Sequence, residues 1–70
     1  MIMNDVKSTA IKSIGYDPNR RILRVQFPSG KIYEYSEVSL MDFAVFMNAP
    51  SKGSHFQHYI KPYYDGEEVE

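Results

Sequence analysis

Alternating hydrophobic and polar residues mark three extended segments in the first half of the chain. In residues 20–27, the large apolar side chains Leu23, Val25 and Phe27 share one parity. Successive side chains of a strand point to opposite faces, so this pattern predicts a half-buried strand. Residues 10–16 and 31–36 show a similar alternation, less regular in the first of them, and are predicted to be strands on either side of it.

Two short turns join these predicted strands. In Asp17-Pro18-Asn19, proline presets its own φ and the flanking side chains can bond back to the backbone. In Pro28-Ser29-Gly30, the glycine can take the positive φ that a tight hairpin needs. Short turns between consecutive strands predict a three-stranded antiparallel meander.

The second half of the chain changes to a helical period. Apolar residues recur at i, i+3, i+4 and i+7 in Leu40, Phe43, Ala44 and Met47, which predicts one apolar helix face, and Val45 and Phe46 widen it. Ser39 followed by Asp42 resembles a capping box at the start of this helix. Asn48-Ala49-Pro50 ends it, because the residue before a proline avoids the helical region.

A second, shorter helix is predicted to begin at residues 51–54. Its apolar face consists of Phe56, Tyr59 and Ile60, and Pro62 ends it. Strands followed by helices indicate an α+β fold, a three-stranded antiparallel β-meander followed by two short helices packed on one face.

The chain is expected to contain one domain with two irregular ends. Residues 1–7 have no clear period and are predicted to be a flexible lead, residues 8–64 form the domain, and residues 65–70 form an acidic tail. Four of the nine acidic residues lie in that tail, so residues 1–64 carry a formal charge of +3. A tail of this kind is usually solvated, and less often shields a basic surface from non-specific partners.

Composition excludes several classes of function. Seventy residues allow a single modest core, and the absence of cysteine removes disulfides, thiolate nucleophiles and thiolate metal sites. The apolar runs are too short for a membrane span and the N-terminus does not resemble a secretory signal, so we expect a cytoplasmic protein that does not bind membranes. His55 and His58 lack a third metal ligand and no serine lies in a nucleophile motif, so we expect no metal, no cofactor and no enzyme.

Tyr33 and Tyr35 are the most informative pair in the sequence. In a strand they point to the same face, with Ile32 and Glu34 on the other. Two interpretations remain open. The rings can complete the inner face of a small sheet, or they can form an exposed platform on which a base or sugar stacks.

Ser51-Lys52-Gly53-Ser54 is the best candidate for an anion site. A helix N-terminus presents unpaired N–H groups, Ser51 and Ser54 could add hydroxyls, and Gly53 permits close approach. The simpler interpretation is that Ser51 is an N-cap and Gly53 relieves a tight helix–helix contact.

Several basic side chains lie on or beside the predicted strands. Arg24 shares a strand face with Arg20, opposite Leu23 and its apolar neighbours, and Lys12 and Lys31 could lie near it in a suitable register. These cations are either a solvated outer face balanced by Glu34 or a shallow positive patch for phosphates.

The order of these signals resembles the KTSC domain, a small module named for the C-terminus of some lysyl-tRNA synthetases. The resemblance covers roughly residues 8–64 and rests on the segments Ile14-Gly15-Tyr16-Asp17, Leu23-x-Val25-x-Phe27, Gly30, Tyr33-x-Tyr35, Val38, Ala49, Ser51-x-Gly53 and Phe56-x-x-x-Ile60. Ser39 stands where the family often has proline, and both residues suit a helix start. The resemblance implies a stand-alone bacterial or phage-type protein, or an appendage, of unknown function for which RNA binding has been suggested.

We therefore expect a non-catalytic module that binds RNA or another nucleic acid. Tyr33 or Tyr35 would stack on bases, while the candidate phosphate contacts are Arg24, Lys12, Lys31 and Lys52 together with the second helix N-terminus. The alternative is a module that binds a protein partner or a second copy of itself through a sheet edge and the apolar side chains Met41, Val45 and Phe46.

Overall fold

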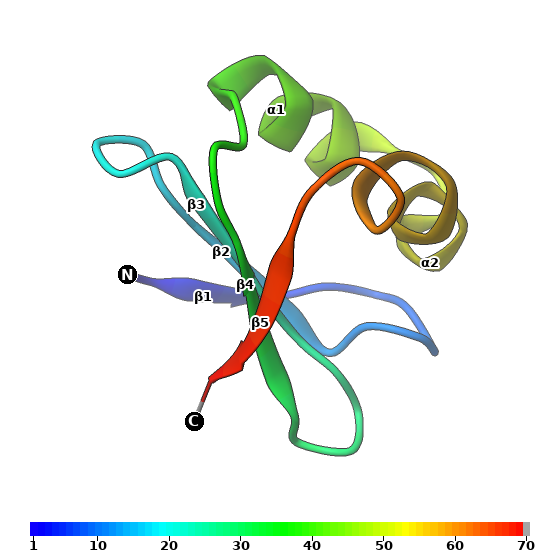
Figure 1. Ribbon diagram of the computed structural model, residues 1–70. Helices are drawn as coiled ribbons and strands as arrows, with labels where there is room; N and C mark the ends of the chain where they lie inside the picture. The colour runs from blue at the N-terminus through cyan, green and yellow to red at the C-terminus, as the bar shows by residue number, and fades with distance from the viewer. Residues whose placement is uncertain (70) are drawn as a thin grey trace.

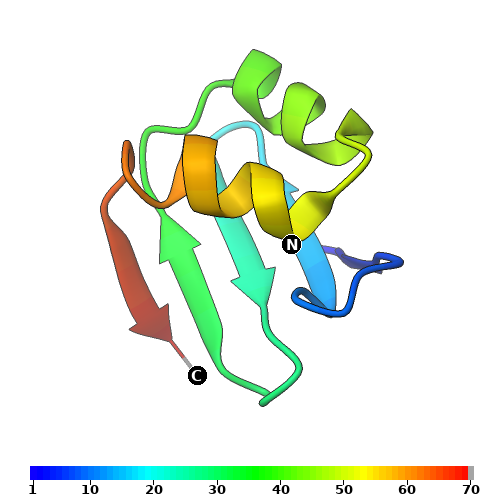
Figure 2. The same cartoon turned by 90° about the vertical axis from the view of Figure 1, so that its right-hand side faces the viewer.

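A computed structural model describes residues 1–69 and contains one twisted antiparallel sheet with its helices on a single face (Figures 1 and 2). The sheet has five strands in chain order: β1 (Met3–Asp5), β2 (Ser13–Asp17), β3 (Ile22–Gln26), β4 (Ile32–Tyr35) and β5 (Gly66–Val69). The α+β class, the three central strands and their antiparallel meander order are confirmed.

The expected number of strands is wrong, because each end of the chain adds an edge strand. β1 lies in the segment expected to be an irregular lead, and β5 lies in the expected acidic tail. These short strands are mostly exposed, so burial imposes little hydrophobic alternation on their sequences. Their pairing depends on two glycines, since the Met3 side chain packs over Gly15 and the Tyr35 ring packs over Gly66. Glu70 lies outside the described residues.

Both predicted turns form as their residues indicate. The Asp17 carboxylate accepts hydrogen bonds from the backbone N–H groups of Asn19 at 3.0 Å and Arg20 at 3.2 Å. Gly30 has a φ of 94° and donates its N–H to the Phe27 carbonyl at 2.9 Å. These local contacts set the pairing of β3 with β2 and β4.

Helix α1 (Leu40–Asn48) begins where the sequence predicts. The Ser39 hydroxyl accepts a hydrogen bond from the Asp42 N–H at 3.1 Å and so caps the first turn. The predicted apolar face is buried at Phe46, but it is wrong in part, because Leu40, Ala44 and Val45 are exposed. Only one side of α1 faces the core. Because the large Phe46 ring occupies that side, the opposite side of the helix faces solvent.

The second helix changes its hydrogen-bond pattern along its length. α2 (Lys52–His55) passes directly into a π-helical segment, η1 (Phe56–Ile60), in which the Lys61 N–H donates to the Phe56 carbonyl at 2.9 Å. Figure 2 shows this continuous helix crossing in front of the sheet. Phe56 and Ile60 are buried as expected, but Tyr59 points to solvent and is not part of the buried face.

The core lies between the sheet and these helices. Its buried members are Ile11, Ile14, Leu23, Val25, Tyr35, Val38, Phe46, Phe56 and Ile60. At one margin Tyr16 stacks on Phe43 with ring centroids 4.4 Å apart and donates its hydroxyl to the Val38 carbonyl at 2.5 Å. Within residues 1–69, no helix is both long and apolar enough to cross a bilayer.

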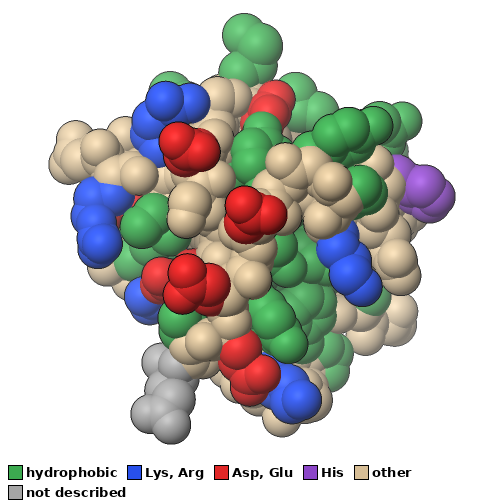
Figure 3. Space-filling view, in the orientation of Figure 1, with side chains coloured by type: hydrophobic (Ala, Val, Ile, Leu, Met, Phe, Trp, Pro, Cys, Tyr) green, Lys and Arg blue, Asp and Glu red, His purple; other side chains and the backbone are tan. Residues whose placement is uncertain are grey.

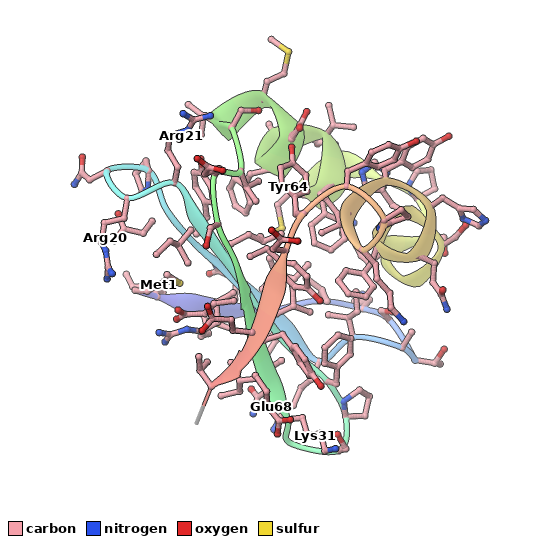
Figure 4. The ribbon with its side chains drawn as sticks, in the orientation of Figure 1. Met1, Arg20, Arg21, Lys31, Tyr64 and Glu68 are labelled. Carbon is pink, nitrogen blue, oxygen red and sulfur yellow. The ribbon has the colours of Figure 1, made fainter. Side chains whose placement is uncertain are left out.

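Tyr64 connects the segment before β5 to α1. Its hydroxyl donates a hydrogen bond to the Asp42 carboxylate, and Figure 4 shows the ring beside that helix. This hydrogen bond, with burial and the nearby Asp42 charge, raises the pKa of Tyr64 from 10.0 to about 12. The fold therefore favours the neutral phenol.

Tyr64→Phe is expected to lower the free energy of unfolding by about 1 kcal/mol near neutral pH, because one side-chain hydrogen bond is lost. Since the folded-state pKa of Tyr64 lies above its unfolded value, this contribution is complete below pH 10 and disappears as the pH rises toward 12. Urea denaturation of both proteins across this range measures the difference. Tyr63→Phe removes the hydroxyl of the exposed neighbouring ring and is the control. Its difference in stability from the parent protein should not shrink as the pH rises.

Candidate functional site

A groove of about 880 Å³ is lined by the loop before β2, by β4 with the residue after β3, and by the second helix. Three parts of the chain enclose it, and the lining residues are Ser8, Thr9, Ala10, Ile11, Phe27, Tyr33, Tyr35, Ser51, Gly53, Ser54, Phe56, Gln57, His58 and Lys61. In Figure 3, hydrophobic side chains lie in the hollow to the right of β5, and acidic side chains lie to the left of this hollow. The groove thus combines an aromatic floor with a polar rim.

The two strand tyrosines point to the same face, as predicted, but differ in exposure. Tyr35 is only 5% exposed and packs edge-on against Phe56 beneath the helix, with ring centroids 5.6 Å apart. Burial, and secondarily the neighbouring Tyr33, raises the pKa of Tyr35. Tyr35 therefore belongs to the core, and only its edge reaches the back of the groove.

Tyr33 is the accessible member of the pair. It is half-buried on the groove floor and meets Phe27 edge to face, with ring centroids 5.8 Å apart. Its hydroxyl lies 3.5 Å from Glu68 Oε1 on β5, at the outer limit of a hydrogen bond. The ring is thus positioned from two sides while part of it remains open to a ligand.

Ser51, Gly53 and Ser54 all line the groove, and their geometry agrees with the simpler structural interpretation. The Ser51 hydroxyl accepts from the Ser54 N–H at 3.3 Å and is the N-cap of α2. A Cβ added at Gly53 would lie 2.8 Å from the Ala10 Cβ. The close contact at Gly53 is therefore with the loop before β2, and not with another helix as expected.

The expected basic patch does not lie on the tyrosine face. Arg24 shares a row with Gly15 and Glu34 on the outer face of the sheet, and its Nε donates to Glu34 Oε2 at 2.7 Å. Lys52 donates its ammonium to the Ala49 carbonyl at 2.7 Å and so caps the end of α1. Neither residue lines the groove.

The remaining predicted cations are also outside the groove. Lys12 is exposed just before β2, and Lys31 is exposed beside the β3–β4 turn, at the bottom of Figure 4. Arg20 and Arg21 lie beside the β2–β3 turn, far from Lys31 in that view. Ser51, Gly53 and Ser54 therefore line the groove with Tyr33, whereas none of Arg24, Lys12, Lys31 and Lys52 does.

Sequence reasoning missed the polar side of the second helix. Gln57, His58 and Lys61 line the groove beside Ser54. The signal was available, because residues 54, 57, 58 and 61 follow the i, i+3, i+4, i+7 spacing of one helix face. His58 Nδ1 lies 2.9 Å from the Ser54 carbonyl oxygen. Because a carbonyl oxygen can only accept a hydrogen bond, Nδ1 is the donor in this contact.

The electrostatics of the groove favour an anion with an aromatic or planar part. None of its lining residues within the described chain is acidic, and Lys61 supplies a full positive charge. Glu68 marks the β5 border, where a negatively charged ligand would be repelled. Residues 1–69 contain no group of three or more His, Cys, Asp or Glu side chains that could hold a metal ion.

Comparison with known proteins identifies the domain. The KTSC domain model matches residues 7–64. The crystal structure of a KTSC domain protein from Yersinia pestis is 36% identical and superposes with a TM-score of 0.95, covering 99% of this chain and 97% of that one. An uncharacterised protein of Stutzerimonas stutzeri is 39% identical over 57 residues, which is 81% of this chain and 80% of that protein.

The same domain also occurs inside a larger enzyme. A lysine–tRNA ligase of a Nostoc species is 41% identical over 59 residues, a match that includes 84% of this chain but only 10% of the ligase. This chain thus spans about a tenth of the ligase's length, and the shared part lies in the C-terminal region of such ligases. Because the family model matches most of the chain and the solved KTSC domain protein has the same fold, the chain belongs to the KTSC domain family.

Proposed function

We propose that the protein is a non-catalytic module that binds single-stranded RNA in the groove between the second helix and the sheet. The observation that carries this proposal is the shared position of Tyr33 and Lys61 in one groove whose described lining has no acidic residue. A ring for stacking and a cation for a phosphate are the two elements that single-strand binding needs.

Tyr33 is the stacking residue in this proposal. Its ring packs edge to face against Phe27, so part of its ordering entropy is lost before a ligand binds. Every base has a π-face, and stacking on an aromatic side chain contributes about 1–3 kcal/mol per base. Tyr35 acts only through packing, because it is buried beneath Phe56.

Lys61 is the phosphate contact, in place of the strand cations. The hydroxyl of Ser54 and the ring of His58 lie on the same rim and add polar partners. Glu68 is exposed on β5 opposite Tyr33, so the RNA backbone would leave the groove on the helix side. Arg24, Lys12, Lys31 and Lys52 lie outside the groove and have no role in a contact confined to it.

The relatives give this proposal a biological context. A lysine–tRNA ligase acts on a tRNA, as its name states, and the ligase of the Nostoc species contains a domain similar to this one. A domain that contacts single-stranded RNA would suit that enzyme as well as a protein made of the domain alone.

Fluorescence anisotropy with a labelled uridine oligonucleotide of about eight nucleotides tests the proposal. Affinity should fall as salt rises, with a slope of log K against log salt of about −0.7 for each phosphate contacted. Tyr33→Leu should weaken binding at least about fivefold, because a stacked base is lost. Lys61→Gln should make the salt slope shallower by about 0.7.

Two matched variants control for these changes. Tyr59→Leu alters an exposed tyrosine that does not line the groove, and Arg20→Gln removes a charge at the distant β2–β3 turn (Figure 4). Both should bind like the parent protein. Binding that is absent at low salt, or that does not respond to salt or to Tyr33→Leu, contradicts the proposal.

Protein binding is the second candidate function, because α1 exposes apolar side chains. Leu40, Met41 and Val45 are all in solvent, whereas Phe46, which we had expected to contribute, is buried. Association of two copies through this surface would make the sedimentation coefficient rise with protein concentration, which RNA binding does not require.

A further inference from the structure

A second cleft, of about 630 Å³, lies on the opposite side of the second helix from the groove. α1 contributes Asp42 and Val45 to it, and the end of the second helix with the turn that follows contributes Tyr59, Tyr63 and Tyr64. The two hollows share no lining residue. A function of this cleft is therefore separable from RNA binding.

Two tyrosine rings stand open at this cleft. Tyr59 is 61% exposed and Tyr63 is 74% exposed. Tyr59 nevertheless packs against the body of the protein. Its ring centroid lies 4.9 Å from that of His55, and the His55 ring stacks on the buried Phe46 with centroids 5.5 Å apart. Supported but open aromatic faces attract cations through the negative face of the ring.

With histidine counted as neutral at pH 7, the described lining of the cleft, which includes the His55 imidazole, carries one negative charge. Asp42 is the acidic group, its carboxylate is held by the Tyr64 hydroxyl, and no lysine or arginine of residues 1–69 lines the cleft. Arg21 lies close enough to Tyr64 to affect its pKa, but it is not among the lining residues. A phosphate would be repelled here, whereas a guanidinium group could pair with Asp42 while lying on a tyrosine face.

The surface beside the cleft is apolar. Met41 and Val45 are exposed on α1, and Val45 also lines the cleft itself. Together with the carboxylate and the tyrosines, this surface complements a peptide that carries a basic side chain between apolar ones.

We propose that the cleft between α1 and the second helix binds a segment of a partner protein by receiving an arginine side chain against Asp42, Tyr59 and Tyr63. Apolar residues that flank the arginine in the partner then contact Met41 and Val45. The charge of Asp42 and the absence of lysine and arginine from the lining within the described chain favour this occupant over a nucleic acid.

Titration of the isotope-labelled protein with acetyl-Leu-Arg-Leu-amide, followed by amide NMR shifts, tests the inference. The peptide should shift resonances of Asp42, Tyr59 and Tyr63 in a saturable way. The same peptide with citrulline in place of arginine keeps the shape but loses the charge, and should bind about fivefold more weakly or worse. Asp42→Asn keeps an oxygen for the Tyr64 hydroxyl and should weaken arginine binding by a similar factor.

Tyr33→Leu is the control and should leave peptide binding unchanged, because Tyr33 lines only the other hollow. A Tyr59→Leu variant that keeps its melting temperature should bind the peptide less well. Equal binding of the arginine and citrulline peptides, or no shift at this cleft, overturns the inference. So would a uridine oligonucleotide that shifts the same resonances in the parent protein, since the cleft would then accept nucleic acid.

Discussion

Phe46→Ala is expected to lower the free energy of unfolding by about 3–5 kcal/mol, the usual cost of deleting a fully buried phenylalanine. Phe46 has no exposed surface and heads the fully buried side chains by size. Its ring stacks on His55 and lies 6.4 Å from that of Phe56, so it joins α1 to the second helix. A domain of this size has a total stability of roughly 4–10 kcal/mol, so the variant should be largely unfolded at modest urea concentrations.

Val45→Ala is the matched control for this prediction. Val45 is the preceding residue of the same helix but is 53% exposed, so its truncation should change stability by less than about 0.5 kcal/mol. Urea denaturation followed by circular dichroism measures both variants. A loss of less than about 1 kcal/mol in Phe46→Ala would show that this ring does not fill the core.

Gly66→Ala is expected to destabilise the protein by about 1–3 kcal/mol and to loosen β5 from β4. A Cβ at residue 66 would meet the Tyr35 ring at its Cε1, Cδ1 and Cζ atoms, in contacts at 2.9 Å or closer. Tyr35 is buried against Phe56, so its ring cannot move aside without disturbing the core. Amide hydrogen exchange should therefore speed up in residues 66–69 more than in β2 and β3.

A double-mutant cycle with Tyr35→Leu separates this contact from a general backbone effect. The smaller leucine leaves room for a methyl group at residue 66, so Gly66→Ala should cost less in that background. Gly30→Ala is the comparison, because its cost comes from a φ of 94° with nothing within 4 Å of the added Cβ. Its effect should add to that of Tyr35→Leu, and an additive result for Gly66→Ala would contradict the steric explanation.

Local signals in the sequence predicted the parts of the fold that depend on local physics. The alternation of Leu23, Val25 and Phe27, the turn at Asp17 and the cap at Ser39 are all as predicted. Each depends on contacts between residues close in the chain or on one face of one element. The edge strands β1 and β5 depend instead on pairing with distant strands, and so leave little trace in their own sequences.

The candidate site illustrates the same division. The sequence placed Tyr33 and Tyr35 on one face, but whether a ring is core or accessible depends on how far the second helix reaches across the sheet. Spacing alone could not show which of Arg24 and Lys61 is the better phosphate contact. The strand register pairs Arg24 with Glu34, whereas the second helix places Lys61 at the groove.

By itself, then, the sequence determined the class of fold, the central meander with its turns, the starts of both helices and the family. Only the tertiary structure decided the number of strands, the burial of Tyr35 and Phe46, and the assembly of Tyr33, Ser54 and Lys61 in one groove. The physical reason is that periodicity and capping act within a few residues, whereas edge pairing and burial arise when segments far apart in the chain meet.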